Sequence, residues 1–142
     1  MDKKSILFLC TGNSCRSQMA EGWMRKFWGD QFEVFSAGIK KHGMNPRAVQ
    51  VMAEVGVDLS KQTSKTTDEL PSIPFDFVVT VCDSAQENCP YYPGGRLLHQ
   101  SFDDPPALTK DLSDEEEILA IYRRVRDEIK EYTLQLPQKL EA

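Results

Sequence analysis

A cysteine, an arginine and a serine lie close together in one short segment, and their spacing could hold an oxyanion. Residues 10–17 read Cys-Thr-Gly-Asn-Ser-Cys-Arg-Ser. In a tight loop, successive backbone N–H groups can point inward and bind an anion, and a helix that begins at the loop adds partial positive charge. The planar guanidinium of Arg16 can hold two oxygens of a tetrahedral oxyanion. The predicted binding residues are Thr11, Gly12, Asn13, Ser14, Cys15, Arg16 and Ser17.

Cys10 is the candidate nucleophile of this segment. The positive field of the loop favours a thiolate, the form of cysteine that attacks electrophiles. Ser17 can donate a hydrogen bond to the Cys10 sulfur and stabilise its charge. Cysteine, five residues, arginine and serine is a loose pattern, but its place between an apolar run and an amphipathic segment is more specific. The alternative is a strand-to-helix turn whose cysteine is a small buried hydrophobe.

The apolar pattern predicts the elements that must position these residues. It predicts strands over residues 5–10, 32–36, 75–82 and 96–102. It predicts helices from Ser17 to Gly29, from Asn45 to about Gly56, and from Ser113 to about Gln135, before Pro137. Strands that alternate with helices favour a parallel sheet in a single α/β domain over residues 1–142. Ligands of such sheets bind at the carboxyl ends of the strands, where Cys10 and Cys82 both lie.

Composition narrows the function classes. The 142 residues include 17 basic and 22 acidic side chains, giving a net charge of −5. This balance argues against broad nucleic-acid binding, which depends on neutralising phosphates. No apolar run approaches the ~20 residues of a membrane span, and no cleavage site follows the first one. We therefore expect a cytoplasmic monomer with no membrane or nucleic-acid partner, whose four cysteines are catalytic or metal-binding rather than structural disulfides.

Residues 10–17 resemble the active-site loop of the low-molecular-weight protein tyrosine phosphatases. The longer string 10–23, together with Ser-Ala-Gly at 36–38, His-Gly at 42–43 and Asn-Pro at 45–46, resembles the thioredoxin-coupled arsenate reductases, which share that fold. The resemblance implies a three-layer sandwich, a four-stranded parallel sheet with helices on both faces. It also implies arsenate as substrate, with phosphate or sulfate as mimics, no bound cofactor, and thioredoxin as electron donor. Glutaredoxin with glutathione stays open as another donor.

Additional cysteines distinguish a reductase from a phosphatase. Reducing arsenate to arsenite takes two electrons, which two thiols supply on forming one disulfide. Cys82 ends a predicted strand, and Cys89 follows it by seven residues in a polar stretch. The resemblance makes them the second and third redox cysteines, with an intermediate Cys10–Cys82 disulfide and a final Cys82–Cys89 disulfide, and it does not require Cys15. The alternatives are two inert thiols or, with less support from their spacing, a zinc site.

An acid is needed to protonate the departing oxygen, and two aspartates are candidates. Asp103 and Asp104 precede Pro105 after the last predicted strand. The resemblance selects Asp104, because the acid of both families stands directly before a proline. The charge of Asp103 would favour protonated Asp104 by like-charge repulsion. The same composition also fits a solvated turn.

Some members of the resembled family bind a potassium ion behind the loop. Asn13, Glu21 and Ser36 match the side chains of that site, but Lys65 stands where a further carboxylate is expected. A lysine ammonium could occupy the space of the ion and offset the charge of Glu21. We therefore expect no metal in this protein.

Two other functions remain open from the sequence. One is a low-molecular-weight tyrosine or aryl phosphatase, although Asp104 is followed by Pro-Pro-Ala rather than the usual pair of tyrosines. Weak phosphatase side activity is compatible with a reductase. The other is a non-catalytic oxyanion-binding redox module, against which the presence of Asp104 argues, since a binder needs no general acid.

Overall fold

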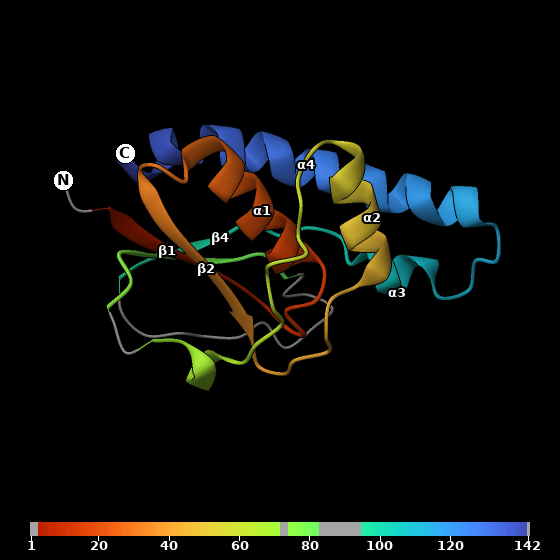
Figure 1. Ribbon diagram of the computed structural model, residues 1–142, viewed down its shortest axis with the longest axis horizontal. Helices are drawn as coiled ribbons and strands as arrows, with labels where there is room; N and C mark the ends of the chain where they lie inside the picture. Colours follow the sequence, from red (N-terminus) through yellow and green to blue (C-terminus); the bar gives the residue numbers. More distant parts are fainter. Residues whose placement is uncertain (1–2, 72–73, 83–94, 142) are drawn as a thin grey trace.

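The computed structural model describes residues 3–71, 74–82 and 95–141 (Figure 1). Four strands form one parallel sheet in the order β2-β1-β3-β4, which confirms the predicted fold class. The strands β3 and β4 are shorter than predicted, while β2 is longer. The bounds are β1 (Lys4–Cys10), β2 (Phe32–Gly38), β3 (Phe77–Thr80) and β4 (Arg96–His99).

Within the described residues, four α-helices and one 3₁₀-helix accompany the sheet. Helix α2 (Pro46–Glu54) begins where the sequence predicts. The Asn45 side chain accepts hydrogen bonds from the N–H groups of Arg47 and Ala48, and Pro46 occupies the first turn. None of the helices in the described part of the chain has the length and apolar character to cross a membrane. The bounds are α1 (Arg16–Trp28), α2 (Pro46–Glu54), η1 (Thr67–Glu69), α3 (Pro105–Thr109) and α4 (Glu115–Glu141).

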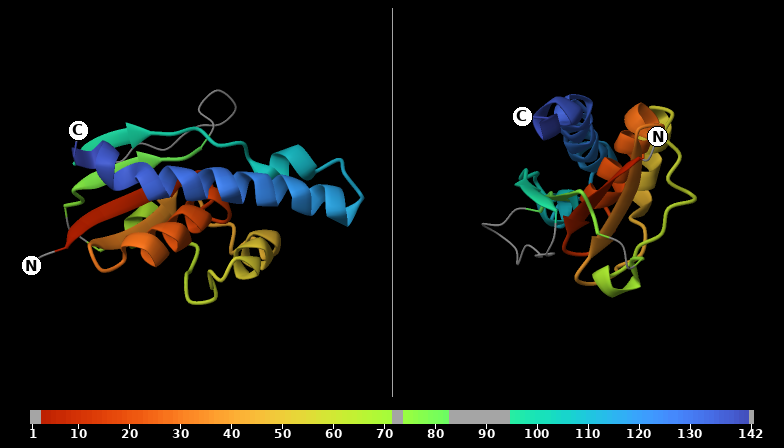
Figure 2. Two further views of the ribbon diagram at one scale, coloured as in Figure 1. Left: turned by 90° about the horizontal axis from the view of Figure 1, so that it is seen from above. Right: turned by 90° about the vertical axis from the view of Figure 1, so that its left-hand side faces the viewer.

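The two faces of the sheet are covered differently. Successive residues of β1 alternate between the faces, so Ile6 and Phe8 join one apolar cluster, while Leu7 and Leu9 join another. The first cluster contains the buried sides of α1, α2 and α4, which pack together on that face (Figure 2). The second contains Leu70 and Phe75, contributed by the segment around η1. The core therefore fixes β1 on both faces, and with it the position of Cys10.

The long helix α4 continues through Pro137 to Glu141, so the prediction that it ends near Gln135 is wrong. Proline lacks the N–H group that would bond to the carbonyl of Thr133, four residues earlier. The indole N–H of Trp28, on α1, donates to that carbonyl instead, at 3.0 Å. Leu136 and Leu140 are buried, so apolar packing also holds the last turns.

The short helix α3 follows Asp104, where the sequence composition indicates only a turn. Asp104 is the N-cap residue of α3, and Pro105 and Pro106 occupy its first turn, where the missing N–H groups cost nothing. This Asp-Pro start is a helix signal that the turn composition conceals. The helix places Asp104 near the carboxyl edge of the sheet.

Candidate active site

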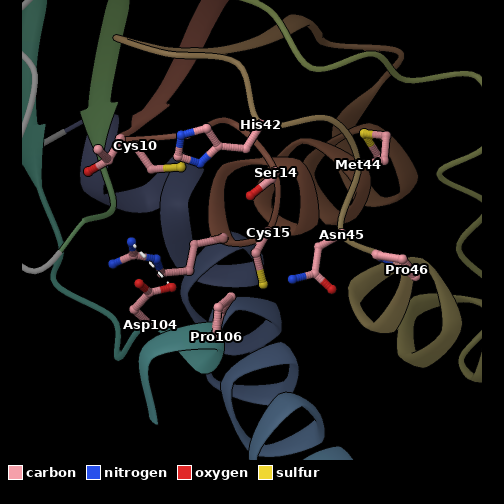
Figure 3. Close-up of a pocket in the computed structure, with 12 residues that line it drawn as sticks. Cys10, Ser14, Cys15, His42, Met44, Asn45, Pro46, Asp104 and Pro106 are labelled. Carbon is pink, nitrogen blue, oxygen red and sulfur yellow. Dashed lines mark ion pairs between the residues drawn. The ribbon is translucent and has the colours of Figure 1, made fainter. Parts of the chain in front are cut away.

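The predicted oxyanion segment forms a loop between β1 and α1, at the carboxyl edge of the sheet, and borders a cavity of about 410 Å³ (Figure 3). Asn13 and Ser17 are fully buried and lie behind the loop rather than in the cavity wall. The cavity is lined by Cys10, Thr11, Gly12, Ser14, Cys15, Arg16, His42, Met44, Asn45, Pro46, Asp104 and Pro106.

Hydrogen bonds from outside the loop hold its carbonyl groups. The residues that follow β2 donate three of them: Lys40 N–H to Thr11 at 3.1 Å, His42 N–H to Gly12 at 3.1 Å, and Asn45 N–H to Ser14 at 3.0 Å. We call residues 40–45 the strap. The carbonyl of Asn13, between these, accepts from the Gln18 side chain at 3.0 Å.

The strap determines where the amide groups of the loop point. In a trans peptide the N–H group points away from the C=O group. The carbonyls of Thr11, Gly12 and Ser14 are held toward the strap, so the N–H groups that follow them, those of residues 12, 13 and 15, point away from the strap. Asn13 adopts a left-handed φ of 48°, a conformation that asparagine tolerates better than most residues. A loop of this kind is compatible with the predicted nest of amide donors, which stays a prediction.

Glycine is required where the strap and β2 meet the loop. A Cβ atom at Gly12 would lie 2.4 Å from Nδ1 of His42. A Cβ atom at Gly38 would lie 2.7 Å from the Thr11 carbonyl oxygen and 2.9 Å from the Asn13 nitrogen. Because backbone atoms cannot move aside as a flexible side chain can, Gly38 is the more restrictive of the two positions.

The hydroxyl group of Ser17 contacts the Cys10 sulfur at 3.0 Å, as expected. The Asn13 side chain determines the direction of this hydrogen bond. Its oxygen accepts from the Lys65 N–H group at 2.8 Å, so its nitrogen faces Ser17 and donates to that hydroxyl at 2.8 Å. The Ser17 hydrogen is then directed at Cys10. The buried Cys10 sulfur is then the acceptor of the Ser17 hydroxyl in this pair.

The side chains that match a potassium site already have partners. Asn13 also donates to Ser36 at 3.0 Å, and Ser36 donates to the buried carboxylate of Glu21 at 2.5 Å. Arg25 pairs with the same carboxylate at 2.6 Å, so Arg25, rather than Lys65 as expected, offsets its charge. The Lys65 ammonium instead donates to the Thr63 and Ser36 carbonyls, at 2.7 Å and 3.4 Å.

This arrangement does not fit a potassium ion, because an ammonium and a guanidinium already supply the positive charge. No cluster of metal-binding side chains occurs among the described residues. We predict that potassium chloride and sodium chloride at equal ionic strength give the same melting temperature and the same phosphate dissociation constant. Thermal unfolding and calorimetric phosphate titration in the two salts test this, and a rise in melting temperature specific to potassium would contradict it.

Arg16 links the loop to the candidate acid. Its side chain is only 4% exposed, donates to the Phe102 carbonyl at 3.2 Å, and approaches the Asp104 carboxylate at 3.6 Å. Asp104 makes no capping hydrogen bond to α3, so its carboxyl group faces the cavity rather than the helix. The Asp103 carboxylate points elsewhere and pairs with Arg124 at 2.9 Å. Its charge is therefore compensated, and the repulsion expected between the two aspartates is reduced.

The cysteines occupy different environments. Cys10 and Cys15 are free thiols, whereas Cys82 is disulfide-bonded. Burial raises the pKa of Cys15 well above its usual value, so this thiol stays protonated at neutral pH and is a weak nucleophile. Cys82 is fully buried two residues after β3, the strand next to β1, and so reaches the same sheet edge as Cys10. Cys89 lies outside the described residues.

Sequence reasoning missed the outer wall of the cavity. His42 and Met44 lie on the strap, and Pro106 lies on α3. His42 enters the sequence analysis only as part of the family resemblance, and no site role is assigned there to Met44 or Pro106, because their position depends on contacts that cross between separate segments. The one sequence signal is the glycine at residue 38, which permits this close approach.

Comparison with known proteins gives a consistent family assignment. The family of low molecular weight phosphotyrosine protein phosphatases matches residues 5–142. An arsenate reductase of Halalkalibacterium halodurans is 53% identical over 130 residues, which is 91% of each chain. The solved structure of an arsenate reductase in the phosphate binding state superimposes with a TM-score of 0.76 at 29% identity, covering 96% of this chain and 98% of that one. A thioredoxin-dependent arsenate reductase of Corynebacterium glutamicum shares the fold, with a TM-score of 0.65 at 24% identity, covering 98% of this chain and 62% of that one.

Proposed function

The chain belongs to the low molecular weight phosphotyrosine protein phosphatase family, and we propose that it is an arsenate reductase that converts arsenate to arsenite. The observation that carries this proposal is the placement of Cys10 and Cys82 at the carboxyl ends of neighbouring parallel strands, beside one oxyanion loop. A phosphatase needs a single thiolate, whereas a reductase needs a second cysteine near the first. The H. halodurans protein named arsenate reductase, whose sequence is 53% identical to this chain, supports the same conclusion.

The first step is attack by Cys10 on arsenate. The amide groups of the loop and the Arg16 guanidinium hold the oxygens of the substrate. The Cys10 thiolate forms a sulfur–arsenic bond, and one arsenic–oxygen bond breaks. The departing oxygen takes a proton from Asp104 and leaves as water. Arg16 contacts Asp104 at 3.6 Å before substrate binds, so the acid already lies beside the oxyanion site.

Two thiol exchanges complete the reaction. The Cys82 thiolate attacks the Cys10 sulfur, a disulfide forms between them, and the electron pair of the sulfur–arsenic bond stays on arsenic, which leaves as arsenite. Cys89 then attacks Cys82, which frees Cys10 and leaves a Cys82–Cys89 disulfide. Two thiols are oxidised for each arsenic that is reduced. Cys82 is disulfide-bonded in this structure, so a dithiol donor must reduce it before it can attack Cys10.

Thioredoxin is the proposed electron donor. It is a dithiol protein whose chemistry matches a disulfide product, and dependence on it is stated for the C. glutamicum enzyme of the same fold. The test is a coupled assay in which this protein, thioredoxin and thioredoxin reductase oxidise NADPH when arsenate is added. Sustained arsenate-dependent oxidation supports the proposal. Turnover with glutaredoxin plus glutathione but not with thioredoxin would contradict the proposed donor. Absence of turnover with either donor system would contradict the proposed reductase function.

The order of the cysteines makes a separate prediction. In Cys89→Ser, we expect at most one arsenite per protein molecule, because the reaction stops at the Cys10–Cys82 disulfide. Arsenite released after a single addition of arsenate measures this stoichiometry, and peptide mapping identifies the disulfide. Sustained thioredoxin-driven turnover in Cys89→Ser would exclude the proposed order.

A further inference from the structure

A buried glutamine that does not line the cavity has no part in the reaction described above. Gln18 lies on α1 and is fully buried. Its side-chain nitrogen lies 3.0 Å from each of three oxygens, the carbonyl oxygens of Asn13 and Thr63 and the side-chain oxygen of Asn13. Backbone carbonyl groups only accept hydrogen bonds, so the nitrogen of the Gln18 amide must face them, and the orientation of this amide is fixed.

A second glutamine holds the Gln18 side chain. The side-chain nitrogen of Gln62 donates to the side-chain oxygen of Gln18 at 2.8 Å and to its carbonyl at 3.1 Å. Gln62 itself is only half-buried. The same segment, residues 62–65, also supplies the Thr63 carbonyl that accepts from Gln18. The Gln18 amide is therefore held at its nitrogen and at its oxygen.

The Asn13 side chain connects this amide to the nucleophile. Its oxygen receives two donors, the Gln18 side chain at 3.0 Å and the Lys65 N–H group at 2.8 Å. Its nitrogen is therefore turned toward the Ser17 hydroxyl, to which it donates at 2.8 Å. The Ser17 hydrogen is then left for the Cys10 sulfur, 3.0 Å away. The hydrogen bonds run in one direction and end at Cys10.

A reversed Asn13 amide would break this order, because its oxygen would accept the Ser17 hydrogen and take it from the sulfur. We propose that Gln18 is a positioning residue, whose side chain keeps the Ser17 hydrogen directed at the Cys10 sulfur. Cysteine attacks as the thiolate, and a donated hydrogen bond favours the charged form of its acceptor. The proposal rests on the proposed function, in which Cys10 is the nucleophile.

The test measures the reactivity of Cys10 in the absence of arsenate. Every variant also carries Cys15→Ala, so that modification of the loop reports on Cys10 alone. The protein is reduced with a dithiol and then alkylated with iodoacetamide at neutral pH, and mass spectrometry follows modification of the peptide that contains Cys10. Gln18→Met keeps the length of the side chain and removes the amide. We expect alkylation to slow roughly fivefold, the scale of one lost hydrogen bond.

The sign of the effect separates positioning from stability. Because Cys10 is buried, a structure that opened more often would expose its sulfur and speed alkylation. Thr133→Val removes a fully buried hydroxyl group from α4 and is the control for lost stability, so it should not slow alkylation. Gln62→Met, at a half-buried position, removes the donor to the Gln18 oxygen and should slow alkylation about twofold.

A double variant shows whether Gln18 acts through Ser17. In a Ser17→Ala background, Gln18→Met should cause no further slowing, because the hydrogen that it directs is gone. Equal slowing in that background, or alkylation that is unchanged or faster in Gln18→Met, would overturn the positioning role. Arsenite released in the first turnover should slow by the same factor as alkylation. If the unaltered protein released no arsenite while alkylation followed the expected pattern, the proposed function would fail and the positioning role would stand.

Discussion

Cys10→Ser abolishes arsenate reduction while the oxyanion loop continues to bind anions. A serine oxygen can neither form a disulfide nor attack arsenic as a thiolate does, so arsenite formation falls at least about 10⁴-fold, the scale seen when a nucleophile is removed. The carbonyl groups of the loop are held by the strap and by Gln18 rather than by the Cys10 side chain, so the loop should keep its shape in this variant. The phosphate dissociation constant should therefore change only a few-fold. Arsenite release and calorimetric phosphate titration measure the two effects.

Cys15→Ala is the matched control for that variant. Cys15 borders the same cavity, but burial raises its pKa, which keeps the thiol protonated, and it cannot take over the attack. We expect this variant to keep most of its turnover, since its backbone N–H remains in the loop. Loss of activity in Cys15→Ala as complete as in Cys10→Ser would mean that the nucleophile has been misassigned.

Arg16→Lys should lower kcat/KM for arsenate about 10²- to 10³-fold, the scale typical for loss of a transition-state charge donor. The planar guanidinium contacts the Phe102 carbonyl and the Asp104 carboxylate and still presents donors to an oxyanion. A single ammonium cannot span these groups. Both kcat and phosphate affinity should therefore fall.

Arg123→Lys is the control for loss of a guanidinium. Arg123 pairs with Glu54 at 2.7 Å on the surface, where one ion pair contributes little. We expect kcat/KM to change less than about twofold in this variant. Steady-state kinetics on both arginine variants, with melting temperatures, provide the comparison. A loss below about threefold in Arg16→Lys would show that the amides alone hold the substrate.

The elements that carry the site are predictable because each depends on local sequence. The apolar run of β1 is buried on both faces, and Asn45 with Pro46 marks the start of α2. Cys10, Arg16 and Ser17 lie in one short segment between a buried strand and an amphipathic helix, so the sequence alone predicts that they share a site. The contact between Cys10 and Ser17 follows from that local geometry.

The remaining features depend on contacts between distant segments. The carbonyl that Pro137 leaves open belongs to Thr133, and it is satisfied by Trp28, 105 residues earlier, so no local rule could extend α4 that far. Lys65 does not neutralise Glu21, because its ammonium donates to the Thr63 carbonyl and to the Ser36 carbonyl, 29 residues away. Likewise the strap, which forms the outer cavity wall, reaches the loop only because β2 lies beside β1.

The carbonyl contacts of the oxyanion loop also determine when the site can exist during folding. One holding partner, Ser64, is 52 residues from the Gly12 carbonyl that it bonds, and the strap donors come from beyond β2. A peptide of the loop alone would lack these contacts, so its amides would not converge on an anion. Because the binding-competent loop belongs only to the folded chain, any oxyanion that it binds stabilises the native state by mass action. The concentration of phosphate in a cell or a buffer thus becomes part of the stability of this protein.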